Sequence, residues 1–235
     1  MRTFLLSAAA FALAFAAPAG AATRNFGITG FEKVRIEGPF KVRLTTGVAP
    51  FASASGSLAA LERVAIDVRG NTLVIHSNLS SWGGYPGQDS GPVEISLGTH
   101  DLSSAWLSGS GALAIDKVKG LSFDLSAQGS ASATVGRTDV DQLNVSVVGT
   151  ANATLAGQAG KLTAVVRGIS SLDAAGLSSR DATIGAEGSA TVAANVSNSA
   201  TVDGSGPATV RLTGRPACTL RVSGSVSVSG CKSSQ

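Results

Sequence analysis

Apolar and small polar residues alternate along most of this chain, and glycines interrupt the alternation at regular intervals. In residues 125–135, leucine, alanine and valine fall on one face, while serine, glutamine and threonine fall on the other. Such a period of two is typical of a half-buried strand. Gly129 separates the two halves of this run, and a glycine at such a point indicates a bend or a left-handed backbone. The pattern predicts short strands joined at glycine corners.

This unit recurs seven times in the second half of the chain, each time with an aliphatic residue four places before a glycine. Successive glycines are 18, 20, 19, 20, 18 and 18 residues apart. A repeat of this length indicates one structural unit stacked on itself. The seven pairs are Leu107/Gly111, Leu125/Gly129, Val145/Gly149, Ala164/Gly168, Ile184/Gly188, Val202/Gly206 and Leu220/Gly224.

Positions at equal phase keep their character from copy to copy, as stacked coils require. The position four places after the glycine is apolar throughout: Ile115, Ala133, Ala153, Leu172, Val192, Val210 and Val228. The position three places after it is small and nearly always polar: Ala114, Ser132, Asn152, Ser171, Thr191, Thr209 and Ser227. A second polar ladder stands five places before the glycine: Thr163, Thr183, Thr201 and Thr219.

These ladders predict an all-β fold, a right-handed parallel β-helix (β-solenoid) with coils of about 18–20 residues. The right-handed sense extends the usual crossover rule to this architecture. Helices are disfavoured because glycine, serine, threonine and valine are abundant and a period of 3.6 is missing. An antiparallel sandwich would need turn signals between strands of opposite direction, rather than one unit at constant phase.

The N-terminal half carries the same unit in a weaker form. Residues 34–38 repeat the four-residue spacing to a glycine, and 64–68 and 73–75 predict two strands around a tight turn. Residues 80–92 have no strand pattern, and 93–97 return to the stack. We therefore expect one domain over 31–231, divided into divergent coils (31–79), a Gly/aromatic loop (80–92) and regular coils (93–231). A leader (22–30) precedes it and a tail (232–235) follows.

The first 21 residues have the three parts of a secretory signal peptide. Arg2 supplies a positive start, 4–17 is apolar, and 19–21 offers small residues for cleavage. The apolar run is too short to cross a membrane, which needs about 20 residues. No later segment is long and apolar enough to cross one either. We expect export to the periplasm, outer surface or medium of a bacterium.

Charge and cysteine content narrow the function further. The net charge of +3 falls by one to +2 without Arg2, and basic and acidic residues are interspersed, so no nucleic-acid-binding surface is expected. Cys218 and Cys231 lie 13 apart in the last copy, and an exported chain favours a disulfide between them. Redox activity is disfavoured because the spacing is not Cys-x-x-Cys.

Several segments resemble one bacterial family, the putative auto-transporter adhesin head GIN domain, formerly a domain of unknown function. They are 31–42 (FEKVRIEGPFKV), 73–76 (LVIH), 107–111 (LSGSG), and the QGSA, EGSA and GSGP segments that begin at Gln128, Glu187 and Gly204. The likeness runs from about Phe31 to about Val228. It implies an exported right-handed parallel β-helix without assigned catalytic residues. The loop at 80–92 and the cysteine pair depart from the pattern.

We find no residues that predict catalysis, a metal site or a cofactor. Asp139 and Asp141 are interpreted as a solvated turn, and His100-Asp101 alone does not define a catalytic triad. No His/Cys/Asp cluster has the spacing of metal ligands. The alternative to a non-enzymatic protein is a polysaccharide lyase or glycosidase with a site near 80–92, which would need two carboxylates about 5–9 Å apart.

The binding hypothesis rests on two features. The polar ladders form a flat face that could lie along a glycan or another component of the envelope surface. Trp82, Tyr85 and His76 lie in or near the 80–92 loop, where exposed aromatic rings could stack on a ligand. The alternative role for these rings is a plug that caps the coil. Exposed final coils can add a neighbour's strand, which allows a homo-oligomer. We expect an exported adhesion, binding or structural module.

Overall fold

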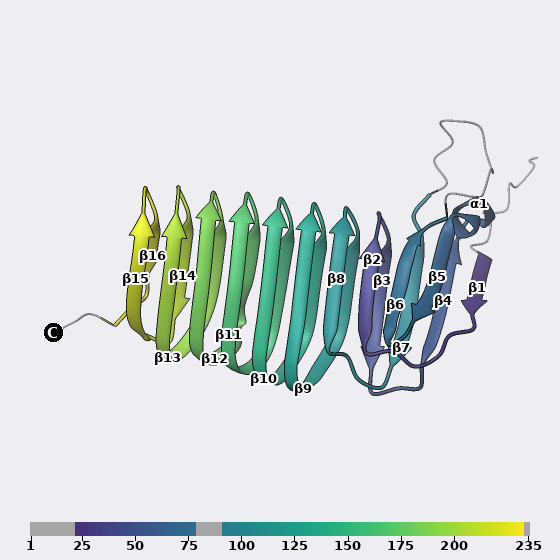
Figure 1. Cartoon of the computed structure of the whole chain (residues 1–235), viewed down its shortest axis with the longest axis horizontal. Helices are drawn as coiled ribbons and strands as arrows, with labels where there is room; N and C mark the ends of the chain where they lie inside the picture. Colours follow the sequence, from purple (N-terminus) through teal and green to yellow (C-terminus); the bar gives the residue numbers. More distant parts are fainter. Residues whose placement is uncertain (1–21, 79–90, 233–235) are drawn as a thin grey trace, which may run out of the picture.

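The computed structural model describes residues 22–78 and 91–232 and is a parallel β-solenoid. Figure 1 shows its strands side by side along the longest axis, with the N-terminal coils at one end and the C-terminal coils at the other. The fold class predicted from the sequence is therefore confirmed. Among the described residues, the one helix, α1 (Leu58–Glu62), is far too short to span a membrane.

Long bent strands make up the regular part of the solenoid. Each begins on one face of the stack, turns, and continues onto another face, pairing in parallel with the strand before and the strand after it. These strands are β9 (Ala112–Gly129), β10 (Ser132–Gly149), β11 (Asn152–Gly168), β12 (Ser171–Gly188) and β13 (Thr191–Ser205). Three shorter strands complete the C-terminal end: β14 (Thr209–Thr213), β15 (Ala217–Ser223) and β16 (Ser227–Ser229).

The core lies inside the coils, where every second residue points inward. In β9, Phe123, Leu125 and Ala127 are buried, while Asp124 is exposed. Leu125 stacks beneath its equivalents in the following coils, and all of them are buried: Val145, Ala164, Ile184 and Val202. The last member of this ladder, Leu220, is 47% exposed because no further coil covers it.

The first copy of the repeat is registered two residues away from the predicted position. In β8 (Ser104–Gly109), Ala105 pairs with Leu125, and Gly109 pairs with Gly129. Leu107/Gly111 was therefore the wrong choice for the first copy of the repeat. In the ladder four places after the glycine, Leu113 rather than Ile115 stacks on Ala133. A shift of two leaves every side chain on its predicted face, so alternation alone could not detect it.

The glycines form a corner where successive coils approach closely. Gly109, Gly129, Gly149 and their later equivalents all have positive φ angles, a conformation that glycine adopts without steric cost. The next residue's amide bonds to the glycine below: Thr150 N donates to Gly129 O at 2.8 Å, and Ser130 N donates to Gly109 O at the same distance. This glycine corner extends back to Gly38, as the sequence predicted.

The N-terminal strands are not stacked in chain order. β2 (Lys33–Glu37) lies between β6 (Thr72–Ser77) and β8. Its continuation, β3 (Lys41–Thr46), lies in the same way between β7 (Glu94–Thr99) and β9. Residues 93–97 do return to the stack, as predicted, but on the far side of the coil formed by β2 and β3.

Antiparallel strands cover the N-terminal end of the stack. β4 (Phe51–Gly56) pairs antiparallel with β7, and β1 (Ala22–Phe26) pairs antiparallel with β4. The predicted leader, 22–30, thus contains a strand. β5 (Val64–Arg69) pairs antiparallel with β6, which confirms the two strands predicted around a tight turn. At the other end of the molecule no strand covers β15 and β16 within the described residues.

Candidate functional site

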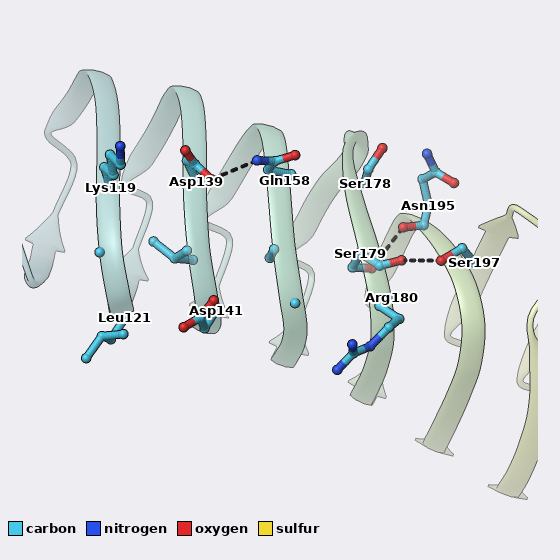
Figure 2. A pocket seen from close by; sticks show the side chains of 14 residues that line it. Lys119, Leu121, Asp139, Asp141, Gln158, Ser178, Ser179, Arg180, Asn195 and Ser197 are labelled. Carbon is cyan, nitrogen blue, oxygen red and sulfur yellow. Dashed lines mark hydrogen bonds between the residues drawn. The ribbon is translucent and has the colours of Figure 1, made fainter.

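A groove of about 780 Å³ follows the solenoid axis where β9 to β13 bend (Figure 2). It crosses successive coils rather than following one strand, so residues about 20 apart in sequence line it together. We call this feature the axial groove. Its lining residues are Lys119, Gly120, Leu121, Asp139, Val140, Asp141, Gln158, Ala159, Gly160, Ser178, Ser179, Arg180, Asn195 and Ser197.

Small side chains at one phase of the repeat form the floor of the axial groove. Val140 pairs in register with Gly120 on one side and Ala159 on the other, and Ala159 pairs with Ser179. Val140, Ala159 and Ser179 are nearly buried. Because these side chains are short, the backbone bend leaves a depression between the residues that precede and follow them.

The residues immediately before the floor form a polar rim. Asp139 pairs in register with Lys119 and with Gln158, and Gln158 pairs with Ser178. Gln158 Nε2 donates a 2.8 Å hydrogen bond to Asp139 Oδ1. Figure 2 shows this rim as a row of side chains from neighbouring coils. The row therefore repeats donors and acceptors at the coil spacing of about 4.8 Å.

The opposite rim is formed by Leu121, Asp141 and Arg180, with Gly160 leaving a gap between the two charged residues. Leu121 is 79% exposed. Arg180 Nε donates to Asp181 Oδ2 at 3.2 Å. Figure 2 shows Asp139 and Asp141 on different rims. The groove thus combines one exposed apolar side chain with charges of both signs.

Hydrogen bonds beside the groove keep Asp181 ionised. Ser199 Oγ and Asn198 Nδ2 each donate to Asp181 Oδ1 at 2.6 Å. These two bonds, with smaller effects from Arg180, hold the pKa of the Asp181 carboxyl below its ordinary value. An ionised Asp181 continues to attract Arg180, although that exposed ion pair adds little to stability.

Irregular pairing between β12 and β13 shapes the C-terminal end of the groove. The register shifts on both sides of Ser179. Ser179 Oγ donates to Asn195 O at 2.8 Å, and Ser197 Oγ donates to Ser179 O at 3.3 Å (Figure 2). Side chains therefore replace part of the regular ladder here and hold Asn195 at the rim.

Of the three residues predicted in or near the aromatic loop, His76 lies within the described structure. His76 lies on β6, with Nε2 3.3 Å from Asp67 Oδ2 and Nδ1 3.2 Å from Ser77 O. Trp82 and Tyr85 lie outside the described residues. His76 is thus paired with a carboxylate of the neighbouring strand, away from the axial groove.

The predicted disulfide is present, since Cys218 and Cys231 are bonded. No group of three or more histidine, cysteine or acidic residues within 22–78 and 91–232 could hold a metal ion. The polar threonine ladder has the predicted register, with Thr163, Thr183, Thr201 and Thr219 in line.

Sequence reasoning missed the axial groove because it interpreted Asp139 and Asp141 as an isolated solvated turn. The available signal was the recurrence of small residues at one phase, with Gly120, Ala159 and Gly160 near the same point of successive copies. The alternation of apolar and polar residues does not show where the strands bend. The sequence therefore does not predict the depression that forms the groove.

Comparisons with known proteins match nearly the whole chain. A family model described as "Putative auto-transporter adhesin, head GIN domain" matches residues 30–216. Among curated proteins, none matches significantly. A solved structure of a putative adhesin from Bacteroides fragilis is similar with a TM-score of 0.81 and 17% identity, over 90% of this chain and 97% of that one.

Two further structures share the fold with a TM-score of 0.69 each. A putative adhesin from Parabacteroides merdae is 16% identical, with 89% of this chain and 95% of that one covered. A protein described as a putative lipid binding protein from Parabacteroides distasonis is 18% identical, with 89% and 96% covered. At these identities the likeness establishes the common solenoid.

Proposed function

This chain belongs to the putative auto-transporter adhesin head GIN domain family, and on that premise we propose that it is an exported, non-enzymatic adhesion module that binds a bacterial surface glycan. The adhesin names of the family and of two structural neighbours support a binding role. The axial groove is the observation that carries the proposal, because it offers a long binding surface on a rigid scaffold.

The charges of the groove favour an uncharged, polar and extended ligand. Lys119 and Arg180 balance Asp139 and Asp141, so a strongly anionic polymer such as nucleic acid would meet as much repulsion as attraction. Gln158 and the neighbouring rim residues supply hydrogen-bonding groups at regular intervals along the axis. A glycan chain, with hydroxyl groups along its length, matches such a row.

Export is supported by the apolar stretch 4–17 and by the disulfide between Cys218 and Cys231. We expect a bacterium that produces the full chain to release a protein beginning at Ala22 into its periplasm or medium. The mass of the intact protein, measured by mass spectrometry in the cytoplasmic, periplasmic and medium fractions, identifies its first residue. A variant lacking 2–21 serves as control and should stay in the cytoplasm. Full-length chain retained in the cytoplasm would contradict the proposal.

Filling the axial groove should weaken the binding of polysaccharides. Ser178 is exposed on the polar rim, so Ser178→Trp should obstruct the groove without disturbing the core. We expect at least a tenfold loss of affinity, measured on an array of purified bacterial capsular and cell-wall polysaccharides. Ser189→Trp is the matched control. Ser189 is exposed beside the glycine corner, outside the axial groove and the polar ladders, so this variant should bind as the unaltered chain does.

The outcome of this experiment also separates binding from catalysis. If Ser178→Trp and Ser189→Trp bind alike, the axial groove is not the binding surface. The same mixtures can be assayed for new reducing ends, and we expect none. Reducing ends released by the unaltered protein would instead establish a carbohydrate-active enzyme. Their loss in Ser178→Trp would place its site in the axial groove, whereas their persistence would leave room for the site near 80–92 that the sequence left as the alternative.

A further inference from the structure

A second candidate site surrounds Trp106, on a different face from the axial groove. Trp106 lies at an outward position of β8 and is half-buried. The guanidinium of Arg35, on the adjacent strand β2, lies over its ring at 4.2 Å from the centroid. Arg35 Nε in turn donates to Glu37 Oε1 at 2.6 Å. One face of the indole is therefore covered and held in place.

Small residues leave the opposite side of the indole open. Trp106 pairs in register with Arg35 on one side and Ser126 on the other, and Ser126 pairs with Ser146 in the next coil. Because both serine side chains are short, they leave a pocket of about 290 Å³ beside the ring. The pocket extends over the following coils to Thr163 and Val165. We call it the Trp106 pocket.

A carboxylate and an amide form the polar edge of the Trp106 pocket. Asp124 and Asn144 pair in register, and Asn144 Nδ2 donates to Asp124 Oδ1 at 2.8 Å. Within the described part of the chain, Asp124 Oδ2 accepts no hydrogen bond. Thr163 follows Asn144 in the same ladder. An aromatic wall thus stands beside a row of oxygen and nitrogen groups that are exposed or partly exposed.

We propose that the Trp106 pocket binds a neutral sugar ring, with its C–H face against the indole and its hydroxyl groups on Asp124 and Asn144. Such a ring has an apolar face and a polar edge, which match the aromatic wall and the polar row of the pocket. Asp124 would repel an acidic sugar, so the ligand is an uncharged one. The volume is near the lower end for ligand sites, about 300 Å³, which suits a short oligosaccharide.

A quaternary ammonium group is the competing ligand, because cations also favour an indole beside a carboxylate. Two observations disfavour it. The positive charge of Arg35 already lies on the covered face of the ring, and it would repel a second cation on the open face. Among the described residues, Trp106 is also the one aromatic residue that lines this pocket, whereas such cations are bound by cages of several rings.

The Trp106 pocket shares no lining residue with the axial groove. The two proposals can therefore fail separately. Ser178→Trp should leave ligand binding at Trp106 unchanged.

Tryptophan fluorescence tests the proposal directly. The chain has two tryptophans, so a Trp82→Phe variant reports on Trp106 alone. We expect a saturable change in its emission with at least one neutral tetrasaccharide of glucose, mannose, galactose or N-acetylglucosamine. Tetramethylammonium chloride, titrated in parallel, should give none. Absence of a saturable change with all four saccharides, or a response to tetramethylammonium alone, would overturn the proposal.

Two further variants, made in the Trp82→Phe background, localise the response. Asp124→Asn keeps a hydrogen-bond acceptor for Asn144 but removes the charge, and it should weaken binding about tenfold. Ser146→Leu should fill the pocket and abolish the response while leaving the stack of Arg35 on Trp106 intact. Asp203→Asn, on the same face but outside the pocket, is the matched control and should bind normally. A full response in Ser146→Leu would place the ligand elsewhere and contradict the proposal.

Discussion

Replacing Gly149 with alanine is expected to lower the free energy of unfolding by about 3 kcal/mol, the sum of two separate costs. Its φ angle is +97°, and a left-handed backbone costs an L-residue about 1–2 kcal/mol. A Cβ atom would also lie 2.7 Å from Gly129 O, and forcing such a contact apart costs about 1–3 kcal/mol. The same carbonyl accepts the hydrogen bond of Thr150 N at 2.8 Å, so the substitution would disturb the spacing of the coils at this corner.

Two other glycine variants separate these costs. Gly70 has a φ angle of +61° but open space around it, so Gly70→Ala should lose only the conformational part, about 1 kcal/mol. Gly185 has no positive φ angle, and its nearest neighbours would be 3.9 Å from a Cβ atom, so Gly185→Ala should leave stability unchanged. Urea unfolding followed by circular dichroism measures all three. Equal midpoints for Gly149→Ala and Gly185→Ala would refute the close-approach argument.

The regular coils could be predicted in detail because their contacts repeat. Each copy of the repeat places Leu125 and its equivalents at the same phase, so one comparison of spacing gives both the burial and the neighbours of each position. The exception is the first copy, where either Gly109 or Gly111 could align with Gly129. These glycines are two residues apart, so both alignments place Leu107 inside the coil. Only the hydrogen-bonded pairing with Gly129 distinguishes them.

The N-terminal arrangement could not be predicted from the same pattern. β2 and β3 alternate like any other coil, and nothing in that alternation says whether the next coil is added on one side or the other. The structure places the later strands β6 and β7 on one side and β8 and β9 on the other. This choice depends on contacts between segments about 40–70 residues apart, with β4, α1 and β5 inserted between them.

The candidate sites depend on the same kind of long-range contact. Alternation alone indicates that Trp106 points outward, because Ala105 and Leu107 point inward. It does not distinguish Trp106 from the aromatic residues of the 80–92 loop, which were the predicted binding residues. The covered face of Trp106 comes from Arg35, which is distant in sequence but adjacent in the stack. Likewise, predicting the axial groove requires the positions at which the strands bend. The alternation of inward and outward side chains does not give these positions.

The C-terminal coil should be the part of the solenoid that depends most on a covalent link. Neighbouring coils cover the inner strands on both sides, whereas β15 and β16 pair only with β13 and β14 in the described structure. Leu220 and Val222 are each 47% exposed as a result. The disulfide between Cys218 and Cys231, 13 residues apart, closes this coil on itself and restricts how far it can open.

Replacing both cysteines with serine is therefore expected to destabilise the last coil by about 3 kcal/mol, the upper value for closing a loop of this length. Because each coil contacts only its neighbours, the loss should stay local. Hydrogen exchange followed by mass spectrometry should show faster exchange in β15 and β16 and unchanged exchange in β10 and β11. Thr219→Ser, on the same strand without a cross-link, is the matched control. Unchanged exchange in β15 would mean that packing on β13 alone holds the coil, and faster exchange along the whole chain would mean that the solenoid unfolds as one unit.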